Sequence, residues 1–592
     1  MLRYLPFAPS TTPLQAVTYL LGISLFSISF LVFLNSSVSF VITDLIGQKE
    51  GVGDVVGTLG FVDELVALVA CPGWGLVSDR LGVRWVAVIG YAVIGVSLAL
   101  FVQAKTVYPQ LLLARVLFAI GASAAATMVT AILPSLTDDS SDEDDEAQAR
   151  IKALQNATAR NSVAFSVESD MTITPERYTQ SVSTEPSIAD ASDSAAGRPS
   201  KLAGFVGLFT GCGALVALTL FLPLPARFGK DKDTTPADAV SSSFYVVALV
   251  ALAVAIFVAI GLRNIKGEQG KGWRVLFGLK NEYESSSGSS GADDQRRVSQ
   301  PQVYRRFVIA NKAQKLTPYL HLVKDSVLLG FVDSRIGLGY VGGFVARASS
   351  VAISLFIPLF VNTFFISNGF CKGSPHDSSP ELKEECRAAY VLSSILTGVA
   401  QLMGLICAPV FGYLASRTGR INYPIVVSTV FGVIGYTILP QLSSPEIKDV
   451  DGRGGSPAIF FVVSLLGISQ IGAIVCSLGS LGRGVLAVDL PQTVRHDALL
   501  QPGEDESVDE SRPLINITTD QEAASRIRLK GSIAGVYSLC GGVAILLLTK
   551  LGGFLFDRLS NGAPFYMMAI FNLILLVFSL GMDASHAFSH RT

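Results

Sequence analysis

Long apolar segments, separated by polar stretches, run through the whole chain. Each is about 20 residues or longer, enough for an α-helix to cross about 30 Å of hydrocarbon. A buried helix of a soluble protein needs an apolar run of only about 14 residues. The pattern therefore predicts an all-α integral membrane protein with twelve transmembrane helices in two six-helix halves. The segments occupy residues 17–42, 55–77, 85–103, 109–133, 201–223 and 244–262, then 340–366, 389–414, 422–440, 458–482, 531–554 and 564–582.

Three longer polar stretches interrupt this pattern. Their composition buries too little apolar area to offset chain entropy, so we expect them to be largely disordered. We interpret the acidic run at 138–146 as a solvated tether, with phosphorylation of Ser140 and Ser141 as the alternative. The predicted organisation is a tail at 1–16, a first half at 17–262 with an acidic, Ser-rich loop at 137–200, a central linker at 263–336, a second half at 337–582 with an acidic loop at 490–529, and a tail at 583–592.

The distribution of Lys and Arg over the short loops predicts the orientation. Arg80 and Arg84 lie between the second and third segments, and Arg417 and Arg420 lie between the eighth and ninth. The short turn on the opposite side, residues 104–108, carries only Lys105. Because short cytosolic loops are enriched in Lys and Arg, both chain termini and the three long loops are expected in the cytosol.

Composition agrees with a membrane protein and excludes several other classes. Half of the 592 residues are hydrophobic and only 16% are charged, whereas soluble domains carry about 25% charged residues. The basic residues lie in loops and form no basic face, so no nucleic-acid partner is expected. A Gly-x-x-x-x-Gly-Lys-Ser/Thr phosphate loop is missing, and the five His residues show no metal-ligand spacing. We expect no enzyme activity, metal or cofactor.

A polar turn between the second and third segments carries the most specific motif. It reads Gly75-Leu-Val-Ser-Asp79-Arg80-Leu-Gly82-Val-Arg84 and is predicted to join two antiparallel helices as a short hairpin. The motif resembles the Gly-x-x-x-Asp-Arg-x-Gly-x-Arg loop of the major facilitator superfamily.

A second, degraded copy of the motif lies between the eighth and ninth segments. It reads Gly412-Tyr-Leu-Ala-Ser416-Arg417-Thr-Gly419-Arg420, with Ser416 where the family has Asp. Two copies at equivalent places indicate the internal repeat of such carriers. The resemblance implies a secondary active transporter whose halves rock about a central cavity.

In that resemblance the first hairpin is part of a gate. Asp79 would lie beside the start of the third helix and pair with an Arg of the other half, while Arg80 and Arg84 would anchor the turn at the phosphate-rich surface. Alternatively, these charges only mark topology. Because Ser416 replaces Asp, the second copy lacks the carboxylate that a matching lock in the second half would need.

Lipid penalises charge within an apolar segment, and among the charged residues found there the candidates for function are Asp63, Glu64, Arg115 and Arg347. Asp63 and Glu64 point about 100° apart, so they are not expected to address one small site together. We expect at least one of them to face a cavity or to pair with a cation such as Arg115. Our hypothesis is that one carboxyl binds a coupled proton; an ion pair that only fixes helix packing is the alternative.

Each of the two arginines allows two interpretations. Arg115 starts a segment similar to the family's Arg-x-x-x-Gly-x-Gly, with Ala119 replacing the first Gly. Arg347 would meet an anionic substrate. Either side chain could instead extend toward the membrane surface. The polar residues Asn35, Asn362, Gln401 and Gln470 are candidates for lining the cavity or for ordinary hydrogen bonds between helices.

Two features lie outside the apolar segments. Cys371 and Cys386 share an outer loop and are predicted either to form one disulfide or to remain two free thiols. Glu510-Ser-Arg-Pro-Leu514-Ile515 fits an acidic dileucine signal that a sorting adaptor could read. It favours a vacuolar or lysosomal membrane, with the plasma membrane as the alternative.

Together these features predict a secondary active transporter of a small solute in a lipid bilayer, with proton coupling as the hypothesis for its energy source. A different class remains open, namely a transporter-like nutrient receptor or scaffold that signals through its cytosolic loops without net flux. The sequence does not identify the solute.

Overall fold

The computed structural model describes residues 6–48, 52–138, 197–228, 235–265, 268, 271–276, 319–368, 387–417, 422–447, 454–486 and 529–589. Over these residues, twelve helices are long and apolar enough to cross a membrane. They coincide with the twelve apolar segments, so the predicted fold class is confirmed.

The first six spans belong to the N-terminal half. Several combine an α-helix with a wider π-helical turn, a feature that bends a helix locally. The elements are α1 (Pro13–Val17), η2 (Thr18–Ser24), α2 (Phe26–Phe40) and η3 (Val41–Leu45) in the first span, then α3 (Val52–Leu81), α4 (Val83–Phe101), η4 (Val107–Leu111) with α5 (Leu112–Thr137), α8 (Arg198–Val216) with η6 (Ala217–Phe221), and α10 (Pro236–Gly261).

A short helix, α9 (Leu224–Phe228), precedes α10, and two more, α11 (Trp273–Leu276) and α13 (Tyr319–Val332), lie between the halves. The C-terminal half then repeats the plan of the first. Its spans are α14 (Ser334–Val351) with η7 (Ala352–Phe356) and α15 (Ile357–Ser367), α17 (Arg387–Ser416), α18 (Tyr423–Ile438) with η8 (Leu439–Gln441), α19 (Ala458–Leu486), α22 (Lys530–Leu547) with η9 (Leu548–Gly552) and α23 (Gly553–Arg558), and α24 (Ala563–Ser589).

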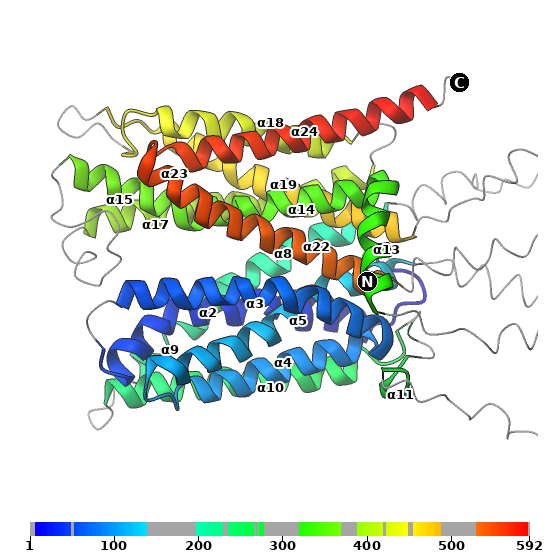
Figure 1. The fold of residues 1–592 in the computed structure, drawn as a ribbon, viewed down its shortest axis with the longest axis horizontal. Helices are drawn as coiled ribbons and strands as arrows, with labels where there is room; N and C mark the ends of the chain where they lie inside the picture. The colour runs from blue at the N-terminus through cyan, green and yellow to red at the C-terminus, as the bar shows by residue number, and fades with distance from the viewer. Residues whose placement is uncertain are drawn as a thin grey trace, which may run out of the picture.

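The two halves lie side by side, and the axes of their long helices are roughly aligned (Figure 1). They meet along two seams: α3 packs against α22, and α8 packs against α17 and α19. Each seam joins helices that are far apart in the sequence. The space between the seams is where a site shared by both halves can form.

Both seams are tightest at the end of the bundle where α3 and α4 join, which we call the Gly82 end. A Cβ on Gly204 would lie 2.8 Å from the Cα of Gly412, and a Cβ on Gly75 would lie 3.0 Å from the Cα of Gly535. Only glycine permits such backbone approach. The opposite end, at the turn between α4 and α5, is called the Tyr108 end.

The turn at the Gly82 end is shorter than the hairpin expected from the sequence. Helix α3 continues to Leu81, so Asp79 and Arg80 are in its last turn, and α4 begins at Val83. Gly82 alone forms the turn, with φ of 101°, a conformation that side chains with a Cβ rarely adopt. The structure differs from the expectation because the polar residues before Gly82 are compatible with a helix.

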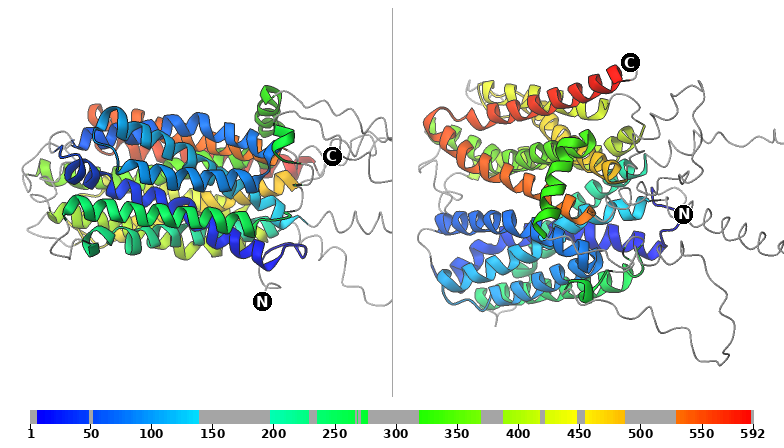
Figure 2. Two further views of the ribbon diagram at one scale, coloured as in Figure 1. Left: turned by 90° about the horizontal axis from the view of Figure 1, so that it is seen from below. Right: turned by 45° about the vertical axis from the view of Figure 1, so that its right-hand side comes forward.

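The central linker contains more structure than expected. Helix α13 lies across the Gly82 end, roughly perpendicular to the spans (Figures 1 and 2). Its Leu322, Val327 and Leu329 pack on a cluster that includes Ile533, and Tyr340 donates a hydrogen bond from its hydroxyl to the carbonyl of Ser326 at 3.0 Å. The helix was not predicted because residues 263–336 are polar on average, although they contain this short amphipathic stretch.

Several predictions lie outside the described residues. These are the content of the loops at 139–196, 277–318 and 487–528, the Cys371–Cys386 pairing, Gly419 and Arg420 of the second motif copy, and the sorting signal with Glu510, Leu514 and Ile515.

Candidate functional site

A cavity of about 350 Å³ lies between the two halves. Helices α2, α3 and α5 of the first half and α14 and α22 of the second half contribute its walls. Most of the lining is apolar, with polar groups at a few places, which is the usual character of a small-molecule site. The polar and charged lining residues are Asn35, Asp63, Glu64, Cys71, Arg115, Ser123, Arg347 and Ser538.

Asp63 and Arg115 form a buried ion pair on one wall of the cavity. Arg115 Nε donates to Asp63 Oδ1 at 2.8 Å, and its Nη2 pairs with the other carboxylate oxygen. The same Nη2 donates to Asn35 Oδ1. The side chains of Arg115 and Asp63 are 3% and 13% exposed. Arg115 therefore lies inside the bundle against a carboxylate and does not extend to the membrane surface.

Glu64 and Arg347 line the same cavity from opposite halves. Among the described residues, neither side chain has a hydrogen bond or an ion pair, and their charges interact across the space between them. Gly541 makes room for the arginine, since a Cβ there would lie 2.6 Å from Arg347 Cγ. Contrary to the expectation from their angular separation, Asp63 and Glu64 both reach this cavity because it extends around α3.

At the Gly82 end, Asp79 joins the first half to the N-terminus of α22. Its two carboxylate oxygens accept hydrogen bonds from the backbone amides of Gly531 and Ser532, each at 2.8 Å. The hydroxyl of Ser532 also donates to this carboxylate. Asp79 thus binds backbone amides at the start of a helix instead of the expected arginine. These amides have no carbonyl partner within their own helix, and the helix dipole favours a negative charge beside them.

A second carboxylate, that of Glu268, lies beside this contact. It was not among the site residues predicted from the sequence. It accepts hydrogen bonds from Val83 N at 2.8 Å, Lys271 Nζ at 3.2 Å and Lys530 Nζ at 2.7 Å. Lys530 also donates to Ser135 Oγ at 2.6 Å. Glu268 therefore links the start of α4 in the first half to the start of α22 in the second.

Electrostatics explain why Glu268 carries charge there. Burial alone raises its pKa, but the positive charges and hydrogen bonds of Lys530 and Lys271 outweigh burial, so the pKa lies below its ordinary value. No motif marked the residue, because it belongs to a short charged stretch of the linker that resembles any solvated loop.

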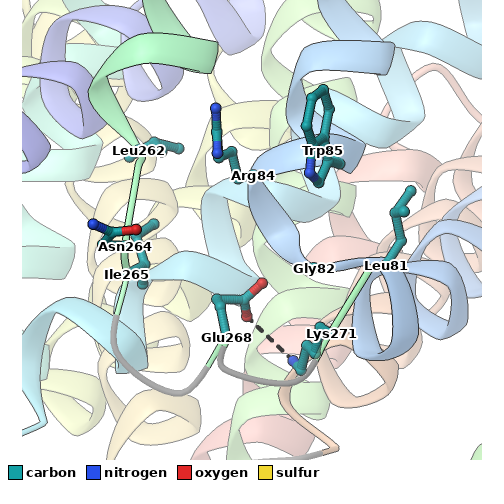
Figure 3. Close-up of a pocket in the computed structure, with 9 residues that line it drawn as sticks. All are labelled: Leu81, Gly82, Arg84, Trp85, Leu262, Asn264, Ile265, Glu268 and Lys271. Carbon is teal, nitrogen blue, oxygen red and sulfur yellow. Dashed lines mark hydrogen bonds and ion pairs between the residues drawn. The ribbon is translucent and has the colours of Figure 1, made fainter. Parts of the chain in front are cut away.

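Arg84 fixes the other face of the turn. Its Nε donates to the carbonyl of Ala259 at 2.9 Å, and its guanidinium lies 5.0 Å from the ring centre of Trp85. Arg84, Trp85, Glu268 and Lys271 line a pocket of about 270 Å³ (Figure 3). Arg80 contributes its carbonyl, which accepts a hydrogen bond from Gly272 N at 3.0 Å. The turn is therefore held by α10 and by the linker.

The second motif copy makes no equivalent carboxylate contact among the described residues. Ser416 Oγ donates to Tyr413 O of its own helix at 2.7 Å, and the guanidinium of Arg417 lies 4.7 Å from the ring centre of Tyr413. Gly412 instead provides the close backbone approach to Gly204. The second seam is thus closed by packing.

The remaining polar candidates are not gathered into the cavity. Asn362 is half-buried in α15 and Gln401 is exposed on α17, and neither is among the residues lining the cavity. Gln470 donates to Ser350 Oγ at 2.8 Å, which is a hydrogen bond between α19 and α14.

Twelve spans in two similar halves, with a shared cavity closed toward one end, define the architecture of a multi-pass membrane carrier. The model of the Major Facilitator Superfamily matches residues 25–145 and 182–486. The chain belongs to this superfamily, which consists of transporters and not of enzymes.

Solved structures show the same fold at low sequence identity. The proton:xylose symporter XylE bound to 6-bromo-6-deoxy-D-glucose is 13% identical with a TM-score of 0.50, and the match covers 95% of this chain and 94% of XylE. A double-tryptophan mutant of XylE is 10% identical with a TM-score of 0.51, covering 97% and 96%. No curated protein sequence gives a significant match.

Proposed function

We propose that the protein is a secondary active transporter that moves a small solute by alternating access. The observation that carries this proposal is the cavity of about 350 Å³ between the halves, to which each half contributes an ionisable side chain. A ligand held by residues of both halves couples its binding to their relative movement.

The contacts at the Gly82 end support one particular conformation of the transporter, in which this end is closed. The glycine pairs, Asp79 and Glu268 hold the halves together at the Gly82 end. The Lys and Arg distribution favours this end as the cytosolic one. On this basis we propose an outward-facing state for the conformation closed at the Gly82 end, with both chain termini in the cytosol.

Proton coupling is the mode of energisation we favour, and Glu64 is the better carrier of the two carboxyls. Asp63 is occupied by Arg115, whereas Glu64 has no such partner among the residues described. A carboxyl that is open to the cavity can exchange a proton or a ligand without breaking a buried ion pair. We further propose a vacuolar or lysosomal membrane as the location, with the cytosolic signal at Leu514 and Ile515 read by a sorting adaptor.

Uptake into proteoliposomes tests the transport proposal. Vesicles with the purified protein receive a mixture of unlabelled sugars, nucleosides, organic acids and amino acids under an imposed pH gradient, and mass spectrometry measures what accumulates. We expect saturable accumulation of at least one solute, lost in Arg347→Gln and kept in the matched control Asn362→Ala. Ligand binding without accumulation of any solute would contradict transport and support the receptor class.

A further inference from the structure

The charges in the cavity are balanced but not all paired. Two carboxylates, Asp63 and Glu64, and two guanidiniums, Arg115 and Arg347, line it. Asp63 and Arg115 neutralise each other. One negative and one positive side chain are left, on α3 of the first half and on α14 of the second, without an ion pair among the described residues.

We propose that the cavity binds a small zwitterion with an apolar side chain, the chemistry of a neutral α-amino acid. Its ammonium group pairs with Glu64 and its carboxylate with Arg347. This assignment rests on the proposed transport function and names the substrate class of the same cavity.

Charge balance favours a zwitterion over an ion. A ligand with no net charge leaves the cavity neutral while it satisfies both open side chains. While Glu64 is ionised, a simple anion would pair with Arg347 and leave Glu64 without a partner, and a simple cation would pair with Glu64 and leave Arg347 without one. Leaving a half-buried charge without a counter-charge is unfavourable, so either ion is held less well than the zwitterion in this state.

The remaining walls fit the side chain of such a ligand. Leu31, Val38, Leu59, Phe118 and Ile545 line the cavity, and an aliphatic or aromatic group placed against them leaves water. Arg115 adds one further donor, because its Nη1 is buried without a hydrogen-bond partner among the described atoms. A carboxylate that contacts Arg347 has a second oxygen available for it.

The same geometry fixes the direction of proton coupling. The ammonium binds only the ionised form of Glu64, so a protonated Glu64 releases its proton when the zwitterion enters. The groups facing Glu64 are Asp63 on its own helix, Arg115 on α5 and Arg347 on α14. The lining residues of α2 and α22 carry no charge. Proton and zwitterion therefore compete for one site, which makes the protein an exchanger.

Binding of three matched ligands to the purified full-length protein tests the assignment by calorimetry. Leucine carries both charges, 4-methylpentanoate lacks the ammonium and 3-methylbutylamine lacks the carboxylate. We expect leucine to bind at least about tenfold more tightly than either analogue, because each analogue leaves one cavity charge unpaired. Equal or tighter binding of 4-methylpentanoate would overturn the assignment in favour of an anion site.

Two variants separate the ends of the ligand. Glu64→Gln is expected to remove the preference for leucine over 4-methylpentanoate and the weakening of leucine binding at low pH. Arg347→Gln is expected to remove the preference for leucine over 3-methylbutylamine. Glu64→Asp and Arg347→Lys should restore part of each preference, which distinguishes ligand contact from loss of folding. Unchanged preferences in both glutamine variants would contradict the proposal.

The result is independent of the transport test. Leucine binding without flux would leave the zwitterion site standing and remove the transporter proposal. Flux of another solute, with no binding of leucine, alanine or phenylalanine, would remove the zwitterion site and keep the transporter.

Discussion

The carboxylate of Asp79 accepts hydrogen bonds from both the backbone amide and the hydroxyl of Ser532, at the first turn of α22. A residue of the second span is thereby fixed to the start of the eleventh, 453 positions away in the sequence. Since α3 and α22 belong to different halves, the contact exists only while the Gly82 end is closed.

We expect Asp79→Asn to shift the protein away from the closed Gly82 end. The amide loses the charge interaction with the helix start, a loss of about 1–2 kcal/mol. Spin labels at Gln103→Cys and Asn561→Cys, in a variant without native cysteines, report the separation of the halves at the Tyr108 end. The label distance should shorten, and Ser416→Ala should leave it unchanged. An unaltered distance in Asp79→Asn would show that this carboxylate does not hold the gate.

Removal of Glu268 should destabilise the protein strongly. The Lys530 side chain is 1% exposed, and Glu268→Ala leaves its ammonium buried without a carboxylate, at a cost of about 3–5 kcal/mol. We expect a lower thermal unfolding temperature, recovered in part by adding Lys530→Met. Lys271→Gln, which removes the more distant lysine, is the matched control and should have a smaller effect. Equal losses in the single and double variants would contradict this account.

Glu268 also predicts an acid limit to stability. Its pKa in the folded protein is below its ordinary value of 4.5, so its contribution is complete above that value and is lost as pH falls through the folded pKa. The unfolding temperature of the wild type should fall in this acid range. Glu268→Gln should start lower and lose less on acidification, and parallel curves for the two proteins would show that another group titrates.

The Asp63–Arg115 pair is expected to behave as one unit. Asp63→Asn leaves a buried guanidinium without a counter-charge and should destabilise by about 3–5 kcal/mol, whereas Asp63→Asn with Arg115→Gln should cost less than the single change. Chemical unfolding of the four proteins of this cycle measures the coupling. Additive effects would mean that the pair contributes no direct interaction.

The proposed sorting signal at Leu514 and Ile515 leads to a prediction about location. Leu514→Ala with Ile515→Ala should move the protein from a vacuolar or lysosomal membrane to the cell surface, as seen by fluorescence at native expression. Leu499→Ala with Leu500→Ala is the control, because that leucine pair in the same loop lacks an acidic residue at the equivalent place. A surface signal from the unaltered protein would remove the argument for this address.

The spans could be predicted because a run of about 20 apolar residues has one stable solution in lipid. The motif singled out Asp79, which the structure places in a contact between the two halves, but it did not predict the partner of that residue. Asp79 binds backbone amides of α22, and a backbone amide cannot be recognised from the residue type. A motif thus located the residue, whereas only the packing of the two halves showed its contact.

The cavity was harder to predict for a related reason. Charged residues in apolar segments indicated Asp63, Glu64, Arg115 and Arg347, since lipid penalises each of them. Asn362 and Gln401 were equally plausible polar candidates, but the rotation of α15 and α17 keeps them out of the cavity lining. Glu268 gave no signal, because its role depends on Lys530 from the other half.

The two seams differ in what must be broken to separate them. Parting α8 from α17 loses the close packing of Gly204 on Gly412, and among the described residues the hydroxyl of Ser416 is bonded within its own helix. Parting α3 from α22 also removes the Gly531 and Ser532 donors of Asp79 and the Lys530 donor of Glu268. Water entering at the Gly82 end would therefore meet unequal resistance at the two seams, and the serine in the second motif copy makes the α8–α17 seam the easier one to open.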